Sequence, residues 1–422
     1  MMEQREKAIL VGVQLKGSSD DEFDYSMEEL GELAAACDVE VVGTITQKLE
    51  RINSSHYIGK GKIEELKSLK EMLEAETVIV DDELSPSQIR NLEADLDCKV
   101  IDRTILILDI FARRAKTKES QLQVEIAKLQ YMLPRLVGLR ESLGRQGGGA
   151  GLANKGAGET KLELDRRKIE EKIAILSKEL AAMVSQREVQ RRQRRKNEIP
   201  MVSLVGYTNA GKSTIMNAML EIYNEATNKK VFEKDMLFAT LDTSVRHIQQ
   251  HDQKSFLLSD TVGFVKKLPH HLVKAFRSTL EEAADADLLI HVVDVSNPHY
   301  KQLMQTTNET LKSIGVENVD TIYAFNKTDL TEMEFPSKEG DAIYLSAKRK
   351  VGIEELTQVI REHIFKDYVQ CTMLIPFENG KLISYFNEHA HIMQTEYEES
   401  GTRIKVECKL ADYEKYQKYV IN

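Results

Sequence analysis

The chain has 422 residues and a mass of 48.0 kDa, with 58 Lys and Arg against 68 Asp and Glu, so its formal net charge is −10. As a whole-chain average, this acidity and a pI near 5.7 argue against a nucleic-acid binder, whose usual signature is a basic surface. Hydrophobic residues at 41% and charged residues at 30% indicate a foldable soluble protein. No apolar run approaches the ~20 residues of a membrane span, and the start shows no cleavable signal pattern. We therefore expect a cytoplasmic protein, loosely associated with a membrane at most.

The first ~100 residues alternate between apolar runs typical of strands and amphipathic helical patterns. The expected strands are Lys7–Leu15, Val39–Thr46, Thr77–Leu84 and Cys98–Asp102. The expected helices are Ser26–Cys37, Lys62–Ala75 and Ser85–Asp95. Ser85 followed by Pro86 is typical of a helix N-cap with proline at the first helical position. Strand–helix alternation at this spacing predicts a small parallel α/β domain.

The charge is unevenly distributed, and this changes what the average implies. From Arg103 to Lys196 there are 22 basic and 11 acidic residues, a net charge of +11, so the rest of the chain carries −21. A segment this basic in an acidic protein indicates a contact surface for a polyanion. The alternative is a solvated helical face with many pairs between residues four positions apart.

The same segment predicts an antiparallel helical hairpin. Apolar residues recur at heptad-like spacing in two stretches, listed as Leu122, Ile126, Leu129 and Leu133, then Ile169, Ile173, Leu176, Leu180 and Met183. The interruption from Leu143 to Glu159 holds seven of the 22 glycines, which predicts a mobile loop at the far end of the hairpin. Arg145 and Lys155 give this loop a positive charge that suits phosphate contact.

A second α/β domain follows the hairpin, and a small α+β unit ends the chain. We expect four domains, at 1–112 (N-terminal α/β), 113–196 (basic hairpin with glycine-rich loop), 197–366 (α/β) and 367–422 (small α+β). In the last domain we expect a strand at Cys371–Phe377, a helix near Gly380–Ala390, and strands at Ile392–Tyr397 and Thr402–Leu410.

The first chemical motif lies between an apolar strand and an apolar helix, at the start of the third domain. It has the GxxxxGK[ST] pattern of a phosphate-binding loop, with residues Gly206, Tyr207, Thr208, Asn209, Ala210, Gly211, Lys212, Ser213 and Thr214. Glycines let backbone N–H groups surround phosphate oxygens, and the helix N-terminus adds positive potential. We expect Lys212 to contact the β- and γ-phosphates and Ser213 to ligate Mg²⁺.

Three further motifs follow apolar strands in the expected order and identify the nucleotide as a guanine nucleotide. They are DxxG (Asp260, Thr261, Val262, Gly263), NKxD (Asn326, Lys327, Asp329) and SAK (Ser346, Ala347, Lys348). Asp260 is the second expected Mg²⁺ ligand, and Gly263 is expected to sense the γ-phosphate. The carboxylate of Asp329 accepts two hydrogen bonds that guanine offers and adenine does not. The four strand ends meet where α/β sheets bind ligands, which predicts a P-loop GTPase.

A short segment of interest lies between the phosphate loop and DxxG, with residues Phe238, Ala239, Thr240, Leu241 and Asp242. A threonine here is expected to sense Mg²⁺ and the γ-phosphate, and we choose Thr240 over Thr243 and Ser244. The catalytic set is thus Lys212, Thr240 and Gly263. Many small GTPases place a water-positioning glutamine after DxxG, where this chain has Phe264. We expect slow intrinsic hydrolysis, assisted by a partner or by an ion such as K⁺ held near Asn209; the alternative for Asn209 is an ordinary loop residue.

Together these residues resemble HflX, a family of ribosome-associated bacterial GTPases related to Obg. The resemblance extends to YIGKGKIEEL (Tyr57–Leu66), DDELSPSQIRNLE (Asp81–Glu93), the stretch Asp102–Leu136, and RQGGG…GAGET…LDRR (Arg145–Arg167). It implies a GTPase domain between an N-terminal α/β domain with a helical hairpin and a small C-terminal domain. It also implies that Ser213 and Thr240 are Mg²⁺ ligands, and that a monomer binds GTP, GDP and the large (50S) ribosomal subunit.

The resemblance further implies that stalled or idle 70S ribosomes are split under stress, with contacts to 23S rRNA for which Arg145, Lys155, Arg166 and Arg167 are the candidates. Two departures indicate a diverged paralogue. Residues Leu152–Ala157 replace the family's usual Thr-Arg-Gly-Pro stretch, and Thr243–Arg246 replace Pro-Thr-Thr-Arg. Two alternatives stay open: an assembly checkpoint for large subunits without splitting, and a separate ATPase activity of the N-terminal domain.

Overall fold

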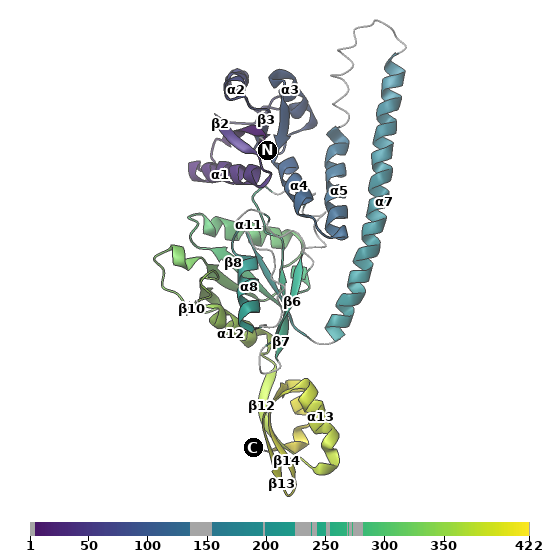
Figure 1. Cartoon of the computed structure of the whole chain (residues 1–422), viewed down its shortest axis with the longest axis vertical. Coiled ribbons are helices and arrows are strands. Elements are labelled where there is room, and N and C mark those ends of the chain that lie inside the picture. Colours follow the sequence, from purple (N-terminus) through teal and green to yellow (C-terminus); the bar gives the residue numbers. More distant parts are fainter. Residues whose placement is uncertain are drawn as a thin grey trace.

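The computed structural model describes residues 5–135, 154–196, 199–223, 238, 243–249, 254–267, 269, 272 and 282–421. Three sheets follow one another along the long axis of the molecule, and one long helix lies beside the first two (Figure 1). The expected α/β class is confirmed.

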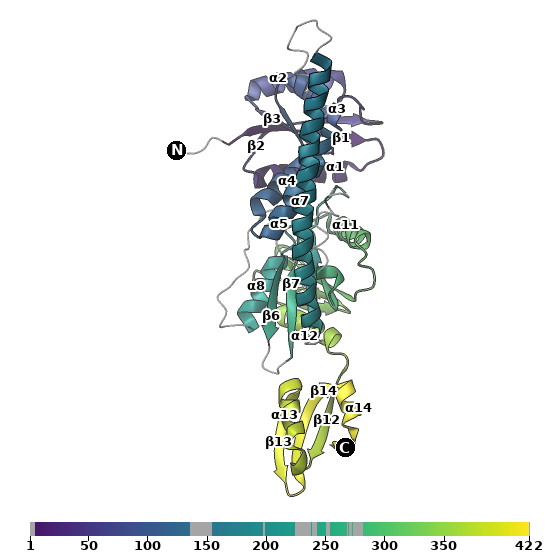
Figure 2. The ribbon, with the colours of Figure 1, turned by 90° about the vertical axis from the view of Figure 1, so that its right-hand side faces the viewer.

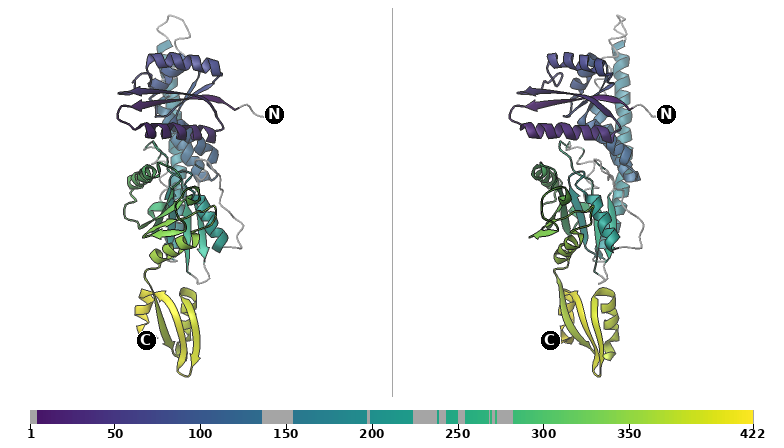
Figure 3. Two further views of the ribbon diagram at one scale, coloured as in Figure 1. Left: turned by 90° about the vertical axis from the view of Figure 1, so that its left-hand side faces the viewer. Right: turned by 60° about the vertical axis from the view of Figure 1, so that its left-hand side comes forward.

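The N-terminal sheet is parallel, with strand order β2-β1-β3-β4. Its elements are β1 (Lys7–Leu15), α1 (Asp20–Ala36), β2 (Glu40–Leu49), α2 (Lys60–Leu73), β3 (Thr77–Val80), α3 (Pro86–Leu96) and β4 (Lys99–Asp102). Helix α1 covers one face of the sheet, and α2 and α3 cover the other (Figure 3). Because both faces are covered, β1 and β3 are apolar nearly throughout, as the sequence predicted.

Two helix starts show what the sequence predicted and what it missed. At α3, the Ser85 side chain accepts a hydrogen bond from the Gln88 N–H at 3.3 Å, and Pro86 opens the helix, as expected. Helix α1 begins six residues before the expected Ser26, after Ser19. Three acidic residues in its first turn, Asp20, Asp21 and Glu22, favour this start because they complement the helix dipole.

The hairpin is antiparallel and consists of α5 (Lys118–Met132) and α7 (Asn154–Lys196), preceded by α4 (Arg103–Arg114). The ion pairs Lys118–Glu179 and Glu125–Lys172 run in opposite directions along the two helices. With 43 residues, α7 is about 65 Å long and lies beside the first two sheets (Figure 2). The heptad-like stripe of α7 is only half-buried, because α5 covers part of it.

One expectation about the hairpin was wrong. The glycine-rich loop was expected to extend to Glu159, but α7 begins at Asn154, so Lys155, Gly156 and Gly158 are helical. Glycine weakens a helix but does not exclude it, and the 43-residue helix continues through both positions. Residues 136–153, with Arg145, lie outside the described residues.

The central sheet has the strand order β10-β11-β9-β8-β5-β7-β6, with β10 and β6 antiparallel to their neighbours. Its strands are β5 (Met201–Gly206), β6 (Ser244–Gln249), β7 (Ser255–Asp260), β8 (Leu288–Asp294), β9 (Thr321–Asn326), β10 (Ser337–Glu339) and β11 (Ala342–Tyr344). Helices α8 (Lys212–Tyr223), α11 (Tyr300–Ser313) and α12 (Ile353–Ile364) belong to the same domain. The four motifs lie where β5, β7, β9 and β11 end.

The C-terminal sheet is antiparallel, with order β13-β14-β12-β15. Its elements are β12 (Tyr368–Ile375), α13 (Gly380–His389), β13 (His391–Glu398), β14 (Gly401–Lys409), α14 (Leu410–Lys415) and β15 (Val420–Ile421). Short 3₁₀ turns occur at Leu133–Arg135, Thr328–Leu330, Phe377–Asn379 and Gln417–Tyr419. None of the described helices is both long enough and apolar enough to cross a bilayer.

Candidate functional site

The phosphate loop leaves β5 at Gly206 and enters α8 at Lys212, in a conformation that requires glycine at two points. Gly206 has φ +146°, and an added Cβ would lie 2.3 Å from the Val292 carbonyl oxygen. Gly211 has φ +96°, and its Cβ would lie 2.1 Å from Asn326 Nδ2. Asn209 also has a positive φ of 60°, which asparagine tolerates better than most residues. The two glycines therefore let the loop pack closely against Val292 of β8 and Asn326 at the end of β9. Asn209, in contrast, is exposed to solvent.

The side chain of Lys212 lies inside this loop. Its ammonium donates to the backbone carbonyl oxygens of Gly206 at 3.1 Å and Tyr207 at 2.7 Å. Burial lowers the pKa of Lys212 to about 8, and the nearby Asp260 carboxylate opposes that shift. The ammonium thus lies in the space that the loop encloses, where a bound phosphate would take the place of the two carbonyl partners.

Ser213 and Asp260, the expected Mg²⁺ ligands, lie side by side. The Ser213 hydroxyl donates to Asp260 Oδ2 at 2.6 Å, at the start of α8 and the end of β7. A hydroxyl and a carboxylate oxygen at this separation are hard ligands of the kind that Mg²⁺ prefers. The third expected ligand, Thr240, lies outside the described residues, as do Ala239, Leu241 and Asp242.

The amide of Asn326 joins two of the motifs. Its Nδ2 donates to the Ala210 carbonyl at 2.9 Å, and its Oδ1 accepts from the Ala347 N–H at 2.9 Å. The phosphate loop and the SAK segment are therefore fixed to each other through a single buried side chain. Ser346 and Ala347 are buried as well, whereas Lys348 is exposed.

Asp329, the carboxylate expected to select guanine, lies at the edge of the same site. The side chain of Asp329 is 8% exposed, and Arg349 Nε approaches its Oδ2 at 3.4 Å. Lys327 has a positive φ of 63° and forms an ion pair with Asp294 at 2.7 Å. This pair fixes the lysine beside the phosphate loop.

The DxxG segment is attached to the phosphate loop by its backbone. Thr208 N–H donates to the Phe264 carbonyl at 2.9 Å, and Phe264 N–H donates to Gly206 at 3.2 Å. A Cβ at Gly263 would lie 2.7 Å from Thr208 Cα, so a larger residue would separate the two segments. The Thr261 hydroxyl donates to Leu204 at 2.7 Å, and Val262 is buried, so both pack inward. The Phe264 side chain is also buried, which removes it from any role in positioning water.

The sequence missed a charged cluster that joins the N-terminal domain to these loops. Arg103, the first residue of α4, forms buried ion pairs with Glu29 of α1 and, at 2.8 Å, with Asp81 after β3. Glu29 also accepts a hydrogen bond from the Tyr207 hydroxyl of the phosphate loop. Asp81 forms a second pair with Lys267, four residues after Gly263. The sequence offered two signals for this cluster. One is the pair of acidic residues that follows β3, in Asp-Asp-Glu-Leu, and the other is the Asp-Arg pair where β4 ends and α4 begins.

A third link involves Phe238, which was expected at the nucleotide. The structure places its ring against Phe111 of α4, with centroids 4.6 Å apart, and buries it. Both segments expected to sense the γ-phosphate therefore contact the N-terminal half of the molecule. Thr214 lies on the first turn of α8.

Two of the expected RNA-contact residues on α7, Arg166 and Arg167, are exposed and paired within the helix. Arg166 contacts Glu170 at 2.9 Å and Arg167 contacts Glu171 at 3.1 Å, each four positions along the helix. These are the pairs that the solvated-face alternative predicts. Of Lys155 the structure gives only its place in α7.

Comparison with known proteins matches three family models in chain order. They are described as GTP-binding GTPase N-terminal (residues 24–112), GTP-binding GTPase Middle Region (114–194) and 50S ribosome-binding GTPase (201–327). A protein named GTPase HflX from Caldanaerobacter subterraneus is 44% identical over 99% of this chain and 94% of its own. GTPase HflX of Escherichia coli is 38% identical over 97% of this chain and 95% of its own.

Among solved structures, a GTP-binding protein of Sulfolobus solfataricus in complex with GDP is similar over 86% of this chain and 99% of its own. The TM-score is 0.44 and the identity 24%. The sequence similarity to the HflX proteins covers nearly the whole chain. The phosphate loop, DxxG, NKxD and SAK segments meet at one site. The chain belongs to the HflX family and is a P-loop GTPase.

Proposed function

We propose that this GTPase binds the large (50S) ribosomal subunit in its GTP state and splits stalled or idle 70S ribosomes. The observation that best supports this proposal is a contact between domains. The phosphate loop and the segment after DxxG touch the N-terminal domain, which leads into the basic hairpin. The family model for residues 201–327, described as a 50S ribosome-binding GTPase, supports the choice of partner. The protein would act as a monomer in the cytoplasm, where ribosomes are found.

The proposed nucleotide site uses the residues that the motifs select. Lys212 binds the β- and γ-phosphates, Asp329 binds guanine, and Lys212, Thr240 and Gly263 are the catalytic set. Ser213, Thr240 and Asp260 would hold Mg²⁺, which neutralises phosphate charge as it develops. The exposed amide of Asn209 would help to hold K⁺, which replaces the stabilisation that Phe264 cannot supply.

The nucleotide state would reach the hairpin through three contacts. Tyr207 binds Glu29, Lys267 binds Asp81, and Phe238 packs on Phe111. Arg103, between Glu29 and Asp81, is the first residue of α4, which leads directly into α5. If γ-phosphate binding shifts the phosphate loop or the segment after DxxG, the contacts of Glu29 and Asp81 would change. These two acids are the partners of the buried Arg103 charge. The position of α4 therefore depends on the nucleotide.

The hairpin and the N-terminal domain would then wedge against 23S rRNA, and hydrolysis would release the protein. The segment from Arg103 to Lys196 has a net charge of +11, whereas the rest of the chain is acidic and disfavours non-specific RNA binding. The proposed RNA contacts are Arg145, Lys155, Arg166 and Arg167. Arg166 and Arg167 would exchange their pairs with Glu170 and Glu171 for RNA phosphates.

The proposal also divides the chain into four domains, at residues 1–112, 113–196, 197–366 and 367–422.

Cosedimentation with 30S, 50S and 70S particles tests the proposal. We expect 50S binding with a non-hydrolysable GTP analogue, weaker binding with GDP, and a steep loss of affinity between 50 and 200 mM salt. A flat salt response would remove the basic segment from the mechanism. Binding only to immature large subunits would instead favour an assembly checkpoint without splitting.

A further inference from the structure

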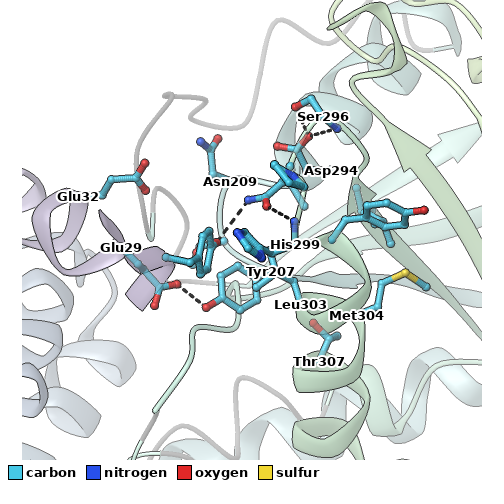
Figure 4. A pocket seen from close by; sticks show the side chains of 18 of the residues that line it. Glu29, Glu32, Tyr207, Asn209, Asp294, Ser296, His299, Leu303, Met304 and Thr307 are labelled. Atoms are coloured by element: carbon cyan, nitrogen blue, oxygen red, sulfur yellow. Dashed lines mark hydrogen bonds between the residues drawn. The ribbon is translucent and has the colours of Figure 1, made fainter. Parts of the chain in front are cut away.

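The GTPase domain meets a neighbouring domain at two junctions, and a cavity lies at each of them. At the N-terminal junction the cavity has a volume of about 440 Å³, and the hydrogen-bonded Tyr207 and Glu29 line it (Figure 4). At the C-terminal junction the cavity has a volume of about 230 Å³. Its walls come from the segment after α7 (Pro200), from the GTPase domain (Lys254) and from the C-terminal domain (His391). The second junction has no part in the function proposed above.

The side chain of Lys254 joins the two domains at the C-terminal junction. Its ammonium lies 2.6 Å from Glu407 Oε1 on β14, and the two side chains are only 10% and 18% exposed. The same ammonium lies 5.4 Å from the ring centroid of Phe365, which follows α12, and 5.2 Å from that of Tyr368, the first residue of β12. Removing one charge from such a sheltered pair leaves the other without a partner, so the contact holds far more firmly than an exposed ion pair.

Lys254 immediately precedes β7, at the closed end of the hairpin that β6 and β7 form. At the open end of this hairpin, Ser244 pairs with Asp260, and Thr240 lies four residues before Ser244 in the chain. The strands run from the nucleotide motifs toward the C-terminal domain (Figure 1). From Ser255 to Asp260 the distance along β7 is about 17 Å. The hairpin therefore connects the C-terminal junction to the residues expected to bind Mg²⁺.

The closed end of the hairpin has little support from the rest of the central sheet. Strand β5 pairs with β7 only from Leu257 onward. In the described part of the chain, Ser255 and Phe256 therefore have β6 as their only neighbouring strand. A two-stranded ribbon is marginally stable unless it packs on something else. Here Ile248 and Phe256 pack on the GTPase core, and Lys254 fixes the end of the ribbon to the C-terminal domain.

We propose that Lys254 is a positioning residue for GTP hydrolysis, through which the C-terminal domain holds the β6–β7 hairpin in place. With its closed end fixed, the hairpin keeps β6 aligned on β7, and so keeps the segment that carries Thr240 beside Asp260. The inference rests on the proposed roles of Thr240 and Asp260 as Mg²⁺ ligands and is independent of ribosome splitting. It gives the C-terminal domain, in which the sequence shows no chemical motif, a role in the reaction.

The test is GTP hydrolysis by the full-length protein without ribosomes, over a range of Mg²⁺ concentrations, with kcat expressed per GDP-binding site. Lys254→Ala should lower kcat about tenfold and raise the Mg²⁺ concentration that gives half the maximal rate, because small displacements of catalytic ligands have large effects on rate. Its affinity for GDP in EDTA should equal that of the wild type, because the phosphate loop and Asp329 lie outside the hairpin.

Two further variants separate positioning from a general loss of stability. Lys254→Arg keeps both the charge and the aromatic contacts, and should restore kcat to within about twofold of the wild type. Lys338→Ala is the matched control, because it removes an exposed ion pair, with Glu362, in the same domain. It should hydrolyse GTP like the wild type.

A double-mutant cycle gives a second readout. Glu407→Gln should lower kcat as Lys254→Ala does, and the double variant should be no slower than either single variant, because all three lose the same contact. Losses that multiply in the double variant, or a loss that Lys254→Arg does not restore, would overturn the inference. Wild-type kcat in Lys254→Ala would overturn it alone if Asp260→Asn still weakens the Mg²⁺ dependence. Wild-type Mg²⁺ dependence in Asp260→Asn would overturn it together with the Mg²⁺ assignment.

Discussion

The Tyr207 hydroxyl donates a hydrogen bond to the Glu29 carboxylate, although the two residues are 178 positions apart. The same hydroxyl accepts the Lys266 N–H at 2.6 Å. One phosphate-loop side chain therefore touches both the N-terminal domain and the segment after DxxG. Burial raises the pKa of both Glu29 and Tyr207, and Arg103 opposes both shifts. The polar groups of this junction are thus shielded from water, and each relies on the others for its hydrogen bonds.

Tyr207→Phe should loosen this junction without removing its ring. The variant leaves one Glu29 oxygen and the Lys266 N–H without their partner, which should destabilise the folded state by about 1–3 kcal/mol. Hydrogen exchange should become faster in α1 and around Lys266. Tyr25→Phe is the control, since among the described residues the hydroxyl of this half-buried tyrosine accepts only a long 3.4 Å bond, from Asn297. Unchanged exchange in α1 of Tyr207→Phe would show that the bond does not hold the domains together.

Nucleotide affinity should depend on pH through Lys212. Its pKa of about 8 in the nucleotide-free protein means that the ammonium is present below pH 8 and is lost above it. Because phosphate binding requires the charge, the affinity for GDP should be flat from pH 6.5 to 7.5 and then fall, by at most about tenfold per pH unit. Fluorescence titration to pH 9 measures this. Lys212→Arg stays charged and should bind with a flat profile, while a flat wild-type profile would contradict the shifted pKa.

Asp329→Asn should change base selectivity. Loss of two charge-assisted hydrogen bonds should reduce GDP affinity by about 10²–10⁴-fold, and xanthosine diphosphate, whose C2 carbonyl accepts a bond from the new amide, should bind better than GDP. Competition titrations measure both affinities. Arg349→Gln removes the exposed partner of Asp329 and is the matched control, with little expected effect. Equal GDP affinity in Asp329→Asn and the wild type would place guanine recognition elsewhere.

Acid should destabilise the fold through His291. Its pKa is lowered in the folded protein to about 4, whereas an unfolded histidine titrates near ~6.5, so the unfolded state binds the proton first as pH falls. The stabilisation is fully present above pH 6.5, and about 2 kcal/mol of it is lost by pH 5.0. His291→Gln should lack this part of the pH dependence in urea unfolding. The exposed His389→Gln should keep it, and identical slopes for all three proteins would refute the assignment.

What could be predicted from the sequence was mainly local. The Ser85 cap, strand β1 and the four nucleotide motifs depend on short spacings, and each lies where the pattern indicated. The start of α7 could not be placed from local composition, because Gly156 and Gly158 are typical of a loop, whereas the long helix that they open tolerates both. The early start of α1 could have been found from Ser19 and the acids that follow it.

The junction between the domains could not be predicted in this way. Glu29 is one acid among several on an amphipathic helix, and nothing near it in the chain distinguishes it from exposed neighbours such as Glu28. Its partner Arg103 was counted with the basic polyanion-binding segment, although it is 1% exposed and pairs with Glu29 and Asp81. Such contacts depend on how two domains meet, which leaves no periodic signal in either of them.

Light scattering of purified 70S ribosomes mixed with this protein tests the central claim most directly. The account predicts that scattering falls to the level of separated subunits with GTP or a non-hydrolysable analogue in Mg²⁺, and stays high with GDP. It also predicts that the effect weakens as salt is raised, because the basic hairpin binds RNA phosphates. Unchanged scattering with GTP, under conditions where the protein cosediments with 50S subunits, would contradict splitting as its function.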